Sequence, residues 1–131
     1  MEEPNKMQVF IVEDAFAMQE ALQDLVCAVV DAEIVGVVSS QATAIDWADS
    51  HPGGWQLAIV DLTLAQGDGF SILRHLKKGS QCGAVVVFSA FVTDVIERHC
   101  LSLGADAVFN KTESRELADY IQELAGSTSP N

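Results

Sequence analysis

Three carboxylates in this sequence directly follow short runs of apolar residues. Glu13 and Asp14 come after the run at 8–12, and Asp61 follows the run at 57–60. Continuous runs of this length, rich in Val and Ile, are typical of strands buried on both faces. The carboxyl ends of neighbouring parallel strands meet at one edge of a sheet, so these carboxylates are expected to lie close together. Crowded carboxylates repel one another without a cation, and their hard oxygens suit Mg²⁺.

A hydroxyl and an ammonium group follow two later apolar runs. Ser89 ends the run at 84–88, and Lys111 comes two residues after the run at 107–109. Both groups can hold phosphoryl oxygens. Each residue alone has a simpler explanation, such as a helix cap or a surface charge. Together with a carboxylate nucleophile and a divalent cation, they indicate phosphoryl transfer onto aspartate, and we expect Asp61 to be the acceptor.

The elements that position these residues alternate regularly along the chain. Each apolar run is followed by a segment whose apolar residues recur at helical spacing. Five such pairs predict a parallel sheet covered by helices on both faces. Ser39 or Ser40 is expected to cap the second helix, Thr93 or Asp94 the fourth, and Thr112 the fifth. The expected strands are 8–12, 33–38, 57–60, 84–88 and 107–109, and the expected helices are 16–30, 41–50, 70–78, 92–103 and 113–125.

In the fourth predicted helix, the residues expected to face the core are Val95, Ile96, His99, Cys100 and Leu103. Gly126 is expected to end the fifth helix, because glycine commonly follows a helix C-terminus. The residues 126–131 then form a polar, flexible tail. We therefore expect one domain over 1–131, with a core at about 7–125.

Composition excludes several classes of function. The chain has 131 residues, 49% of them hydrophobic, which argues against disorder. Nineteen acidic residues against seven Lys and Arg give a net charge of −12, which disfavours direct binding to nucleic acids or anionic membranes. No signal peptide and no membrane-spanning run are evident, so a cytoplasmic location is expected. Three cysteines without metal-site spacing, Cys27, Cys82 and Cys100, are expected to be reduced core residues.

Over roughly residues 7–124 the sequence resembles the receiver domains of bacterial two-component response regulators. The resemblance implies an α/β fold of the flavodoxin-like, doubly wound (βα)5 type, with a five-stranded parallel sheet in the order 2-1-3-4-5. It rests on an ordered set of motifs, namely VFIVED at 9–14, VDL at 60–62, GDGF at 67–70, FSA at 88–90, and GAD at 104–106 leading to Lys111.

The resemblance also implies a role for each acidic residue. Asp61 would accept a phosphoryl group from a phosphohistidine of a sensor histidine kinase or a histidine phosphotransfer protein. Asp14 and Asp61 would ligate Mg²⁺ directly, together with the carbonyl of Thr63, while Glu13 would act through water. Such a domain catalyses its own phosphorylation and dephosphorylation and is not a turnover enzyme on a small substrate.

Further roles follow from the same resemblance. Ser89 and Lys111 would bind the phosphoryl oxygens, and Ser89 would move toward them as the switch. The side chains of Thr63 and Phe91 would govern how easily water reaches the acyl phosphate. An output protein, or a second copy of the chain, would bind through the fourth helix, the last strand and the fifth helix.

Three positions depart from the usual pattern of the family. Val108 stands where an aromatic residue is common, Thr112 replaces the proline that usually follows the lysine, and Ala65 replaces a proline in the loop after the acceptor. A cis bond before Thr112 would cost roughly 2.5–4 kcal/mol. These departures affect how phosphorylation would be transmitted and leave the chemistry in place.

Three other functions fit this set of residues less well. Only Val108 favours a receiver-like interaction module that is not phosphorylated. Such modules lose members of the site, whereas this sequence has all of them, namely Glu13, Asp14, Asp61, Ser89 and Lys111. A flavin-binding fold is disfavoured because Glu13 and Asp14 would repel a flavin phosphate. Phosphatases with an aspartate nucleophile place an acid two residues later, where Thr63 stands. A stand-alone receiver and a piece of a longer regulator remain equally compatible with the sequence.

Overall fold

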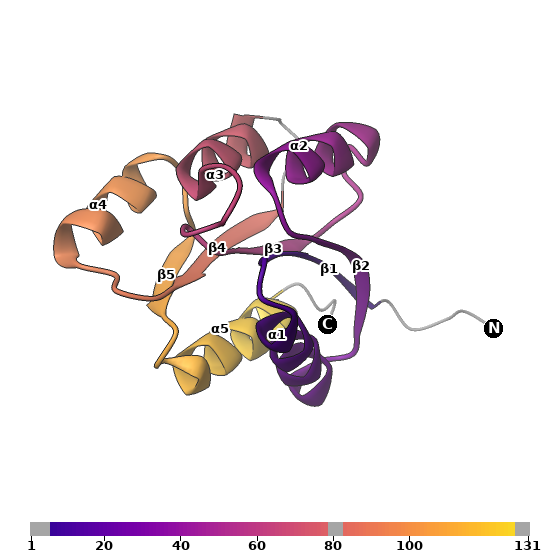
Figure 1. The fold of residues 1–131 in the computed structure, drawn as a ribbon. Coiled ribbons are helices and arrows are strands. Elements are labelled where there is room, and N and C mark those ends of the chain that lie inside the picture. The colour runs from indigo at the N-terminus through magenta and orange to yellow at the C-terminus, as the bar shows by residue number, and fades with distance from the viewer. Residues whose placement is uncertain (1–5, 79–82, 128–131) are drawn as a thin grey trace.

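A computed structural model describes residues 6–78 and 83–127, in which strands and helices alternate (Figure 1). Cys82 and the tail at 128–131 lie outside the described residues. The strands are β1 (Met7–Val12), β2 (Ala32–Val38), β3 (Leu57–Val60), β4 (Ala84–Ser89) and β5 (Ala107–Asn110). The helices are α1 (Phe16–Val29), α2 (Gln41–Ser50), α3 (Gly69–Lys78), α4 (Asp94–Ser102) and α5 (Ser114–Ser127).

The described strands form one parallel sheet in the order β2-β1-β3-β4-β5, which confirms the expected flavodoxin-like topology. Val12 pairs with Val60 and Val60 pairs with Val87, so β1 and β3 end level with each other and β4 continues past them to Ser89. The residues that follow these ends therefore meet at one edge of the sheet.

Helices cover both faces of the sheet, with α1 and α5 on one face and α2, α3 and α4 on the other (Figure 1). Successive residues of each central strand point to opposite faces. On the face covered by α1 and α5, the strands contribute Val9, Ile11, Leu57 and Ile59, which pack with Leu22, Val26, Leu117 and Ile121. On the face covered by α2, α3 and α4, they contribute Phe10, Val12, Ala58 and Val60, which pack with Ala44, Ile72, Leu73 and Cys100.

Two of the predicted helix caps are present, and a third is wrong. Ser40 accepts a hydrogen bond from the Thr43 N–H in a capping box, and Thr93 accepts one from the Ile96 N–H. Thr112 does not cap α5, because that helix begins two residues later, at Ser114. Instead, the Thr112 N–H and hydroxyl donate to the side-chain oxygen of Asn110, which closes the turn after β5.

Helix α4 buries a narrower stripe than its sequence predicts. Cys100 is fully buried and Ile96 is partly buried, but Val95 is 66% exposed, so its predicted core position is wrong. His99 is also exposed, and its ring lies 5.0 Å from that of Phe70 on α3. A short helix at the border of the sheet contacts the core along one line only.

Two smaller expectations also differ from the structure. Cys27 is exposed on α1 and is therefore not a core residue, whereas Cys100 is buried as expected. Helix α5 continues through Gly126 to Ser127 and does not end at the glycine. A glycine costs a helix roughly 1 kcal/mol relative to alanine, which the last turn of a helix can tolerate.

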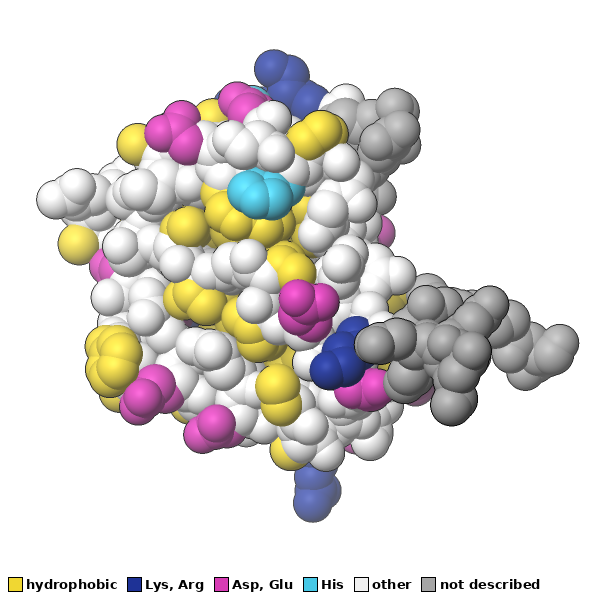
Figure 2. Space-filling view, turned by 90° about the vertical axis from the view of Figure 1, so that its right-hand side faces the viewer, with side chains coloured by type: hydrophobic (Ala, Val, Ile, Leu, Met, Phe, Trp, Pro, Cys, Tyr) yellow, Lys and Arg dark blue, Asp and Glu magenta, His cyan; other side chains and the backbone are white. Residues whose placement is uncertain are grey.

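Figure 2 shows the side of the molecule that lies to the right in Figure 1, where β2 forms the edge of the sheet. Hydrophobic side chains gather across the middle of this face, and a histidine lies on them. The rings of three residues form a stack with neighbouring ring centroids 4.1 Å apart, in the order Phe10, Trp47 and His51. Across the described residues, none of the helices combines the length and the apolar character that a membrane span requires.

Candidate functional site

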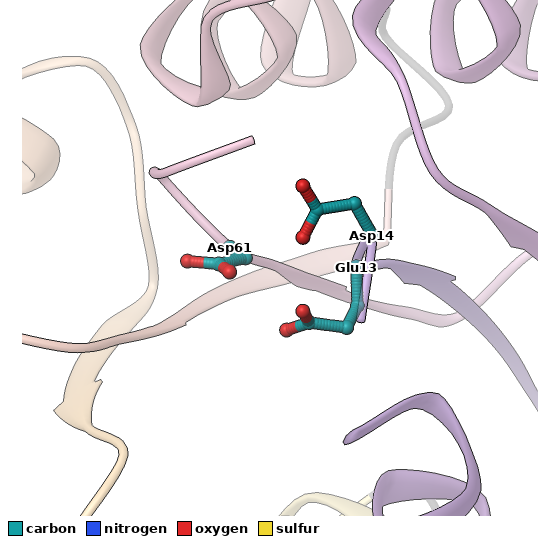
Figure 3. A group of neighbouring side chains, drawn as sticks. All are labelled: Glu13, Asp14 and Asp61. Atoms are coloured by element: carbon teal, nitrogen blue, oxygen red, sulfur yellow. The ribbon is translucent and has the colours of Figure 1, made fainter. Parts of the chain in front are cut away.

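The acidic residues predicted from the sequence lie together at the carboxyl ends of the strands. Glu13 and Asp14 follow β1, and Asp61 follows β3. One carboxylate oxygen of each lies within 4.8 Å of the corresponding oxygens of the other two. In Figure 3 the side chains of Asp14 and Glu13 extend to either side of the strand end, and both carboxylates face toward Asp61.

The carboxylate of Asp61 is 2% exposed and is surrounded by donors. Its Oδ1 accepts hydrogen bonds from the Ser89 hydroxyl at 2.7 Å and from the N–H and hydroxyl of Thr63 at 3.2 Å each. Its Oδ2 accepts one from Lys111 Nζ at 3.0 Å. Buried charges of this kind are stable only when they are paired and hydrogen-bonded.

Lys111 bridges two of the three carboxylates. Its Nζ lies 3.0 Å from Glu13 Oε1 and 3.0 Å from Asp61 Oδ2. Among the described residues this ammonium is the only polar partner of Glu13 Oε1, which is buried and otherwise receives no hydrogen bond. Three carboxylates and one ammonium have a net formal charge of −2, so the cluster still favours a bound cation.

The pKa values of the two buried carboxyls shift in opposite directions. For Glu13, burial is the largest influence and raises the pKa above 4.5, despite the opposing Ala15 N–H and Lys111. For Asp61, burial also raises the pKa, but hydrogen bonds from Ser89 and Lys111 outweigh it and hold the pKa below 3.8. Asp61 is therefore ionised at neutral pH, as a carboxylate nucleophile must be.

Lys111 remains charged at neutral pH. Burial acts to lower the pKa of its ammonium, but the neighbouring carboxylates of Asp61 and Glu13 outweigh burial and raise the pKa above 10.5. A permanent positive charge thus faces the buried oxygen of Asp61.

Close packing of the β3–α3 loop places Asp61 against the start of α3. A Cβ on Gly69 would lie 2.5 Å from the Asp61 carbonyl oxygen and 2.5 Å from Leu62 Cα, so only glycine fits there. Asp68 accepts hydrogen bonds from the Phe70 N–H and the Ser71 hydroxyl and thereby caps α3. The Gly67–Gly69 motif therefore fixes the loop around the carboxylate.

The sequence did not indicate three other contacts of this region. Gln19 Nε2 donates to the Glu13 carbonyl oxygen at 2.6 Å, and Gln41 Oε1 accepts from the Asp68 N–H at 2.8 Å. The Ala65 N–H donates to Asp14 Oδ2 at 2.6 Å. Glutamine side chains and backbone amides carry no recognisable spacing signal, and the loop conformation that brings them together depends on the folded sheet.

Two of the positions that depart from the expected pattern lie in β5 or directly after Lys111. Val108 is partly buried in β5 and pairs with Val87 of β4. The Lys111–Thr112 bond is trans, since no cis peptide bond occurs in the part of the chain that the structure describes. Phe91, two residues after Ser89, has a positive φ of 57° and is 86% exposed.

This fold, with carboxylates, a hydroxyl and a lysine at the ends of successive strands, defines a receiver-type α/β domain. The family model described as the response regulator receiver domain matches residues 9–122. The chain therefore belongs to the response regulator receiver family. The search of curated proteins found no match.

Solved structures of receivers are similar in fold to this chain. A two-component response regulator of the LuxR family from Aurantimonas sp. SI85-9A1 has a TM-score of 0.82 at 18% identity, covering 93% of this chain and 87% of that one. The CheX–CheY–BeF3–Mg complex from Borrelia burgdorferi has a TM-score of 0.82 at 18% identity, covering 91% and 89%. A phosphorylated cyanobacterial phytochrome response regulator, RcpA, has a TM-score of 0.76 at 21% identity, covering 96% and 98%.

Proposed function

We propose that this receiver domain is phosphorylated on Asp61 by a phosphohistidine partner, either a sensor histidine kinase or a histidine phosphotransfer protein. The observation that carries the proposal is the position of the Asp61 carboxylate. It is buried at the end of a central strand, with the Ser89 hydroxyl on one oxygen and the Lys111 ammonium on the other.

In the proposed reaction, Asp61 acts as the nucleophile. A P–O bond forms to a carboxylate oxygen of Asp61 while the P–N bond to the donor histidine breaks and its electron pair returns to the nitrogen. The pKa of Asp61 lies below 3.8 because hydrogen bonds outweigh burial, so the nucleophile needs no general base at neutral pH. Ser89 and Lys111 already point at the acceptor oxygens and would hold the phosphoryl oxygens after transfer.

Glu13, Asp14, Asp61 and the carbonyl of Thr63 would hold Mg²⁺ beside the acceptor. The fit rests on the donor set of this structure. Three carboxylates converge and, together with Lys111, have a formal charge of −2, and one buried Glu13 oxygen is contacted only by Lys111 among the described residues. When bound, Mg²⁺ neutralises the charge that develops on the phosphoryl oxygens. Asp14 and Asp61 would be direct ligands, and Glu13 would act through water.

Two of the similar structures support this proposal by analogy. The Borrelia CheY complex is described with BeF3 and Mg, and RcpA is described as phosphorylated. Their identity to this chain is 18% and 21%, so they share the fold, and the transfer of their ligands to this chain is part of our proposal.

The proposed function is tested by incubating the protein with a small phosphodonor, with Mg²⁺ or with EDTA. We expect an acid-stable, base-labile phosphate in the intact-mass spectrum, formed only with Mg²⁺. Absence of phosphate from the folded wild type with any donor, including a phosphorylated phosphotransfer protein, would favour the alternative of an interaction module that is not phosphorylated. The partly buried Val108, in place of an aromatic switch residue, is the feature that favours this alternative.

A further inference from the structure

One proposed metal ligand is bound by a backbone amide of a distant loop. The N–H of Ala65, in the β3–α3 loop, donates to Asp14 Oδ2 at 2.6 Å. A hydrogen bond from an N–H to an ionised carboxylate is of the stronger, charge-assisted kind. Neither side chain contributes a donor, because alanine has no polar side chain and Asp14 offers only acceptor oxygens.

The loop that carries this amide is itself fixed. Gln41, the first residue of α2, accepts from the Asp68 N–H at 2.8 Å and donates its own N–H to the Gln66 carbonyl at 3.1 Å. Gly67, at a φ of 110°, passes so close to Gln41 that no Cβ would fit between them. Thr63 and Asp68 form a bridge that closes the loop. Ala65 therefore presents its N–H from a braced backbone.

The orientation that Ala65 imposes is the one that brings Asp14 to the acidic cluster. In this orientation, with Oδ2 bound to the Ala65 N–H, one carboxylate oxygen of Asp14 lies within 4.8 Å of the ligand atoms of Glu13 and Asp61 (Figure 3). A carboxylate has two oxygens, so one can keep the amide while the other meets a cation. Hydrogen bonds from neighbouring groups orient metal-ligating carboxylates, and their loss typically reduces metal affinity 10–100-fold.

We propose that the Ala65 N–H is a positioning group that holds Asp14 ready for Mg²⁺, and that Gln41 braces the loop for this role. This inference rests on the proposed metal site. It predicts that metal affinity in this chain depends on a backbone N–H that the proline usual at this position of the family would not supply. Ala65→Pro removes this N–H.

The test compares Mg²⁺ binding to the wild type, Ala65→Pro and Ala65→Ser by calorimetric titration without a phosphodonor. Ala65→Ser is the matched control, because it keeps the N–H at the same exposed position. We expect the dissociation constant of Ala65→Pro to rise about 10-fold or more, and that of Ala65→Ser to stay within about two-fold. Circular dichroism establishes that both variants are folded.

A second measurement on the wild type needs no substitution. The Ala65 amide should be protected from hydrogen exchange before Mg²⁺ is added and should remain protected at saturation. A folded Ala65→Pro that binds Mg²⁺ as tightly as the wild type would overturn the inference and leave the proposed function intact. If Ala65→Pro does not fold, the exchange measurement decides the question, and an unprotected Ala65 amide in the wild type would overturn the inference. A wild type that binds no Mg²⁺ would overturn the proposed metal site together with this inference.

Discussion

The hydroxyl of Ser89 donates a 2.7 Å hydrogen bond to Oδ1 of Asp61, and both side chains are buried. The same hydroxyl oxygen accepts from the Leu62 N–H at 3.4 Å. Ser89 therefore contacts the proposed acceptor before any phosphoryl group is present. The effect of this hydroxyl on the pKa of Asp61 can therefore be measured in the unphosphorylated protein.

We expect Ser89→Ala to raise the pKa of Asp61, because this hydrogen bond is the largest influence that lowers it. Loss of a partner from a buried carboxylate should also reduce the free energy of unfolding at pH 7 by about 1–3 kcal/mol. Carbon-13 NMR titration and urea denaturation measure the two effects. Ser102→Ala, which removes an exposed hydroxyl bonded to the His99 carbonyl, is the control and should change stability by less than about 0.5 kcal/mol. Equal effects of the two substitutions would contradict this prediction.

Lys111→Met should be more destabilising, because it leaves two buried carboxylates without their shared cation. Breaking such a pair typically costs about 3–5 kcal/mol. The control is Lys77→Met, whose partner Asp106 is more exposed, at a side-chain exposure of 38%, and whose ion pair should contribute only about 0–1 kcal/mol. Urea denaturation of both variants at pH 7 checks the comparison.

The pH dependence of the Lys111 effect follows from its pKa, which is raised in the folded state. A raised lysine pKa means that the stabilisation is fully present below 10.5 and is lost as the pH rises through the folded-state value. The difference in stability between wild type and Lys111→Met should therefore shrink above pH 10.5. A difference that stays constant through that range would show that Lys111 stabilises the fold without its charge.

Mg²⁺ should raise the melting temperature, since the three carboxylates come together only in the folded state. A ligand that binds only this state adds about 2.7 kcal/mol at 100 times its dissociation constant. Asp14→Asn should weaken the effect, whereas Asp24→Asn, at an exposed site on α1, removes the same charge and should not. Thermal scans with millimolar Mg²⁺ and with EDTA test this, and an unchanged wild-type melting temperature would exclude the metal site.

For the output surface, we predict that Leu101→Asp blocks phosphorylation-dependent association without affecting phosphate uptake. Leu101 is 46% exposed on α4, one of the elements through which the family resemblance implies that a partner would bind. Light scattering and partner pull-down, with and without beryllofluoride, measure the association. Ala42→Asp at an exposed position of α2 is the control. If Leu101→Asp left every such contact intact, the exposed Phe16 on α1 would mark the next surface to test.

The parallel sheet and the residues at its strand ends could be predicted because the apolar runs are continuous and end abruptly, whereas the strand order followed from the family resemblance. Asp61, for example, follows four fully buried residues. The residues that α4 buries could not be predicted in detail. Ile96 and Cys100 are the ones that face the core, and Val95 and His99 lie next to them in the sequence but are exposed. Periodicity alone does not show how closely a helix approaches its sheet.

The contacts that brace the site were also beyond prediction. The bond from the Ala65 N–H to Asp14 joins residues 51 positions apart, and that of Gln41 to Asp68 joins residues 27 apart. Each depends on a loop conformation that exists only once β1, β3 and α2 are packed together. A backbone donor leaves no trace in the residue type, except that it cannot be a proline.

The assignment of Asp61 as the acceptor is tested by locating the phosphate in the sequence. The wild type and Asp61→Asn are incubated with Mg²⁺ and a small phosphodonor, reduced with borohydride, which converts a phosphoaspartate to homoserine, and analysed by peptide mass spectrometry. We expect homoserine at position 61 in the wild type and no phosphate in a folded Asp61→Asn. Homoserine at another aspartate in the wild type, or undiminished phosphate on Asp61→Asn, would contradict it.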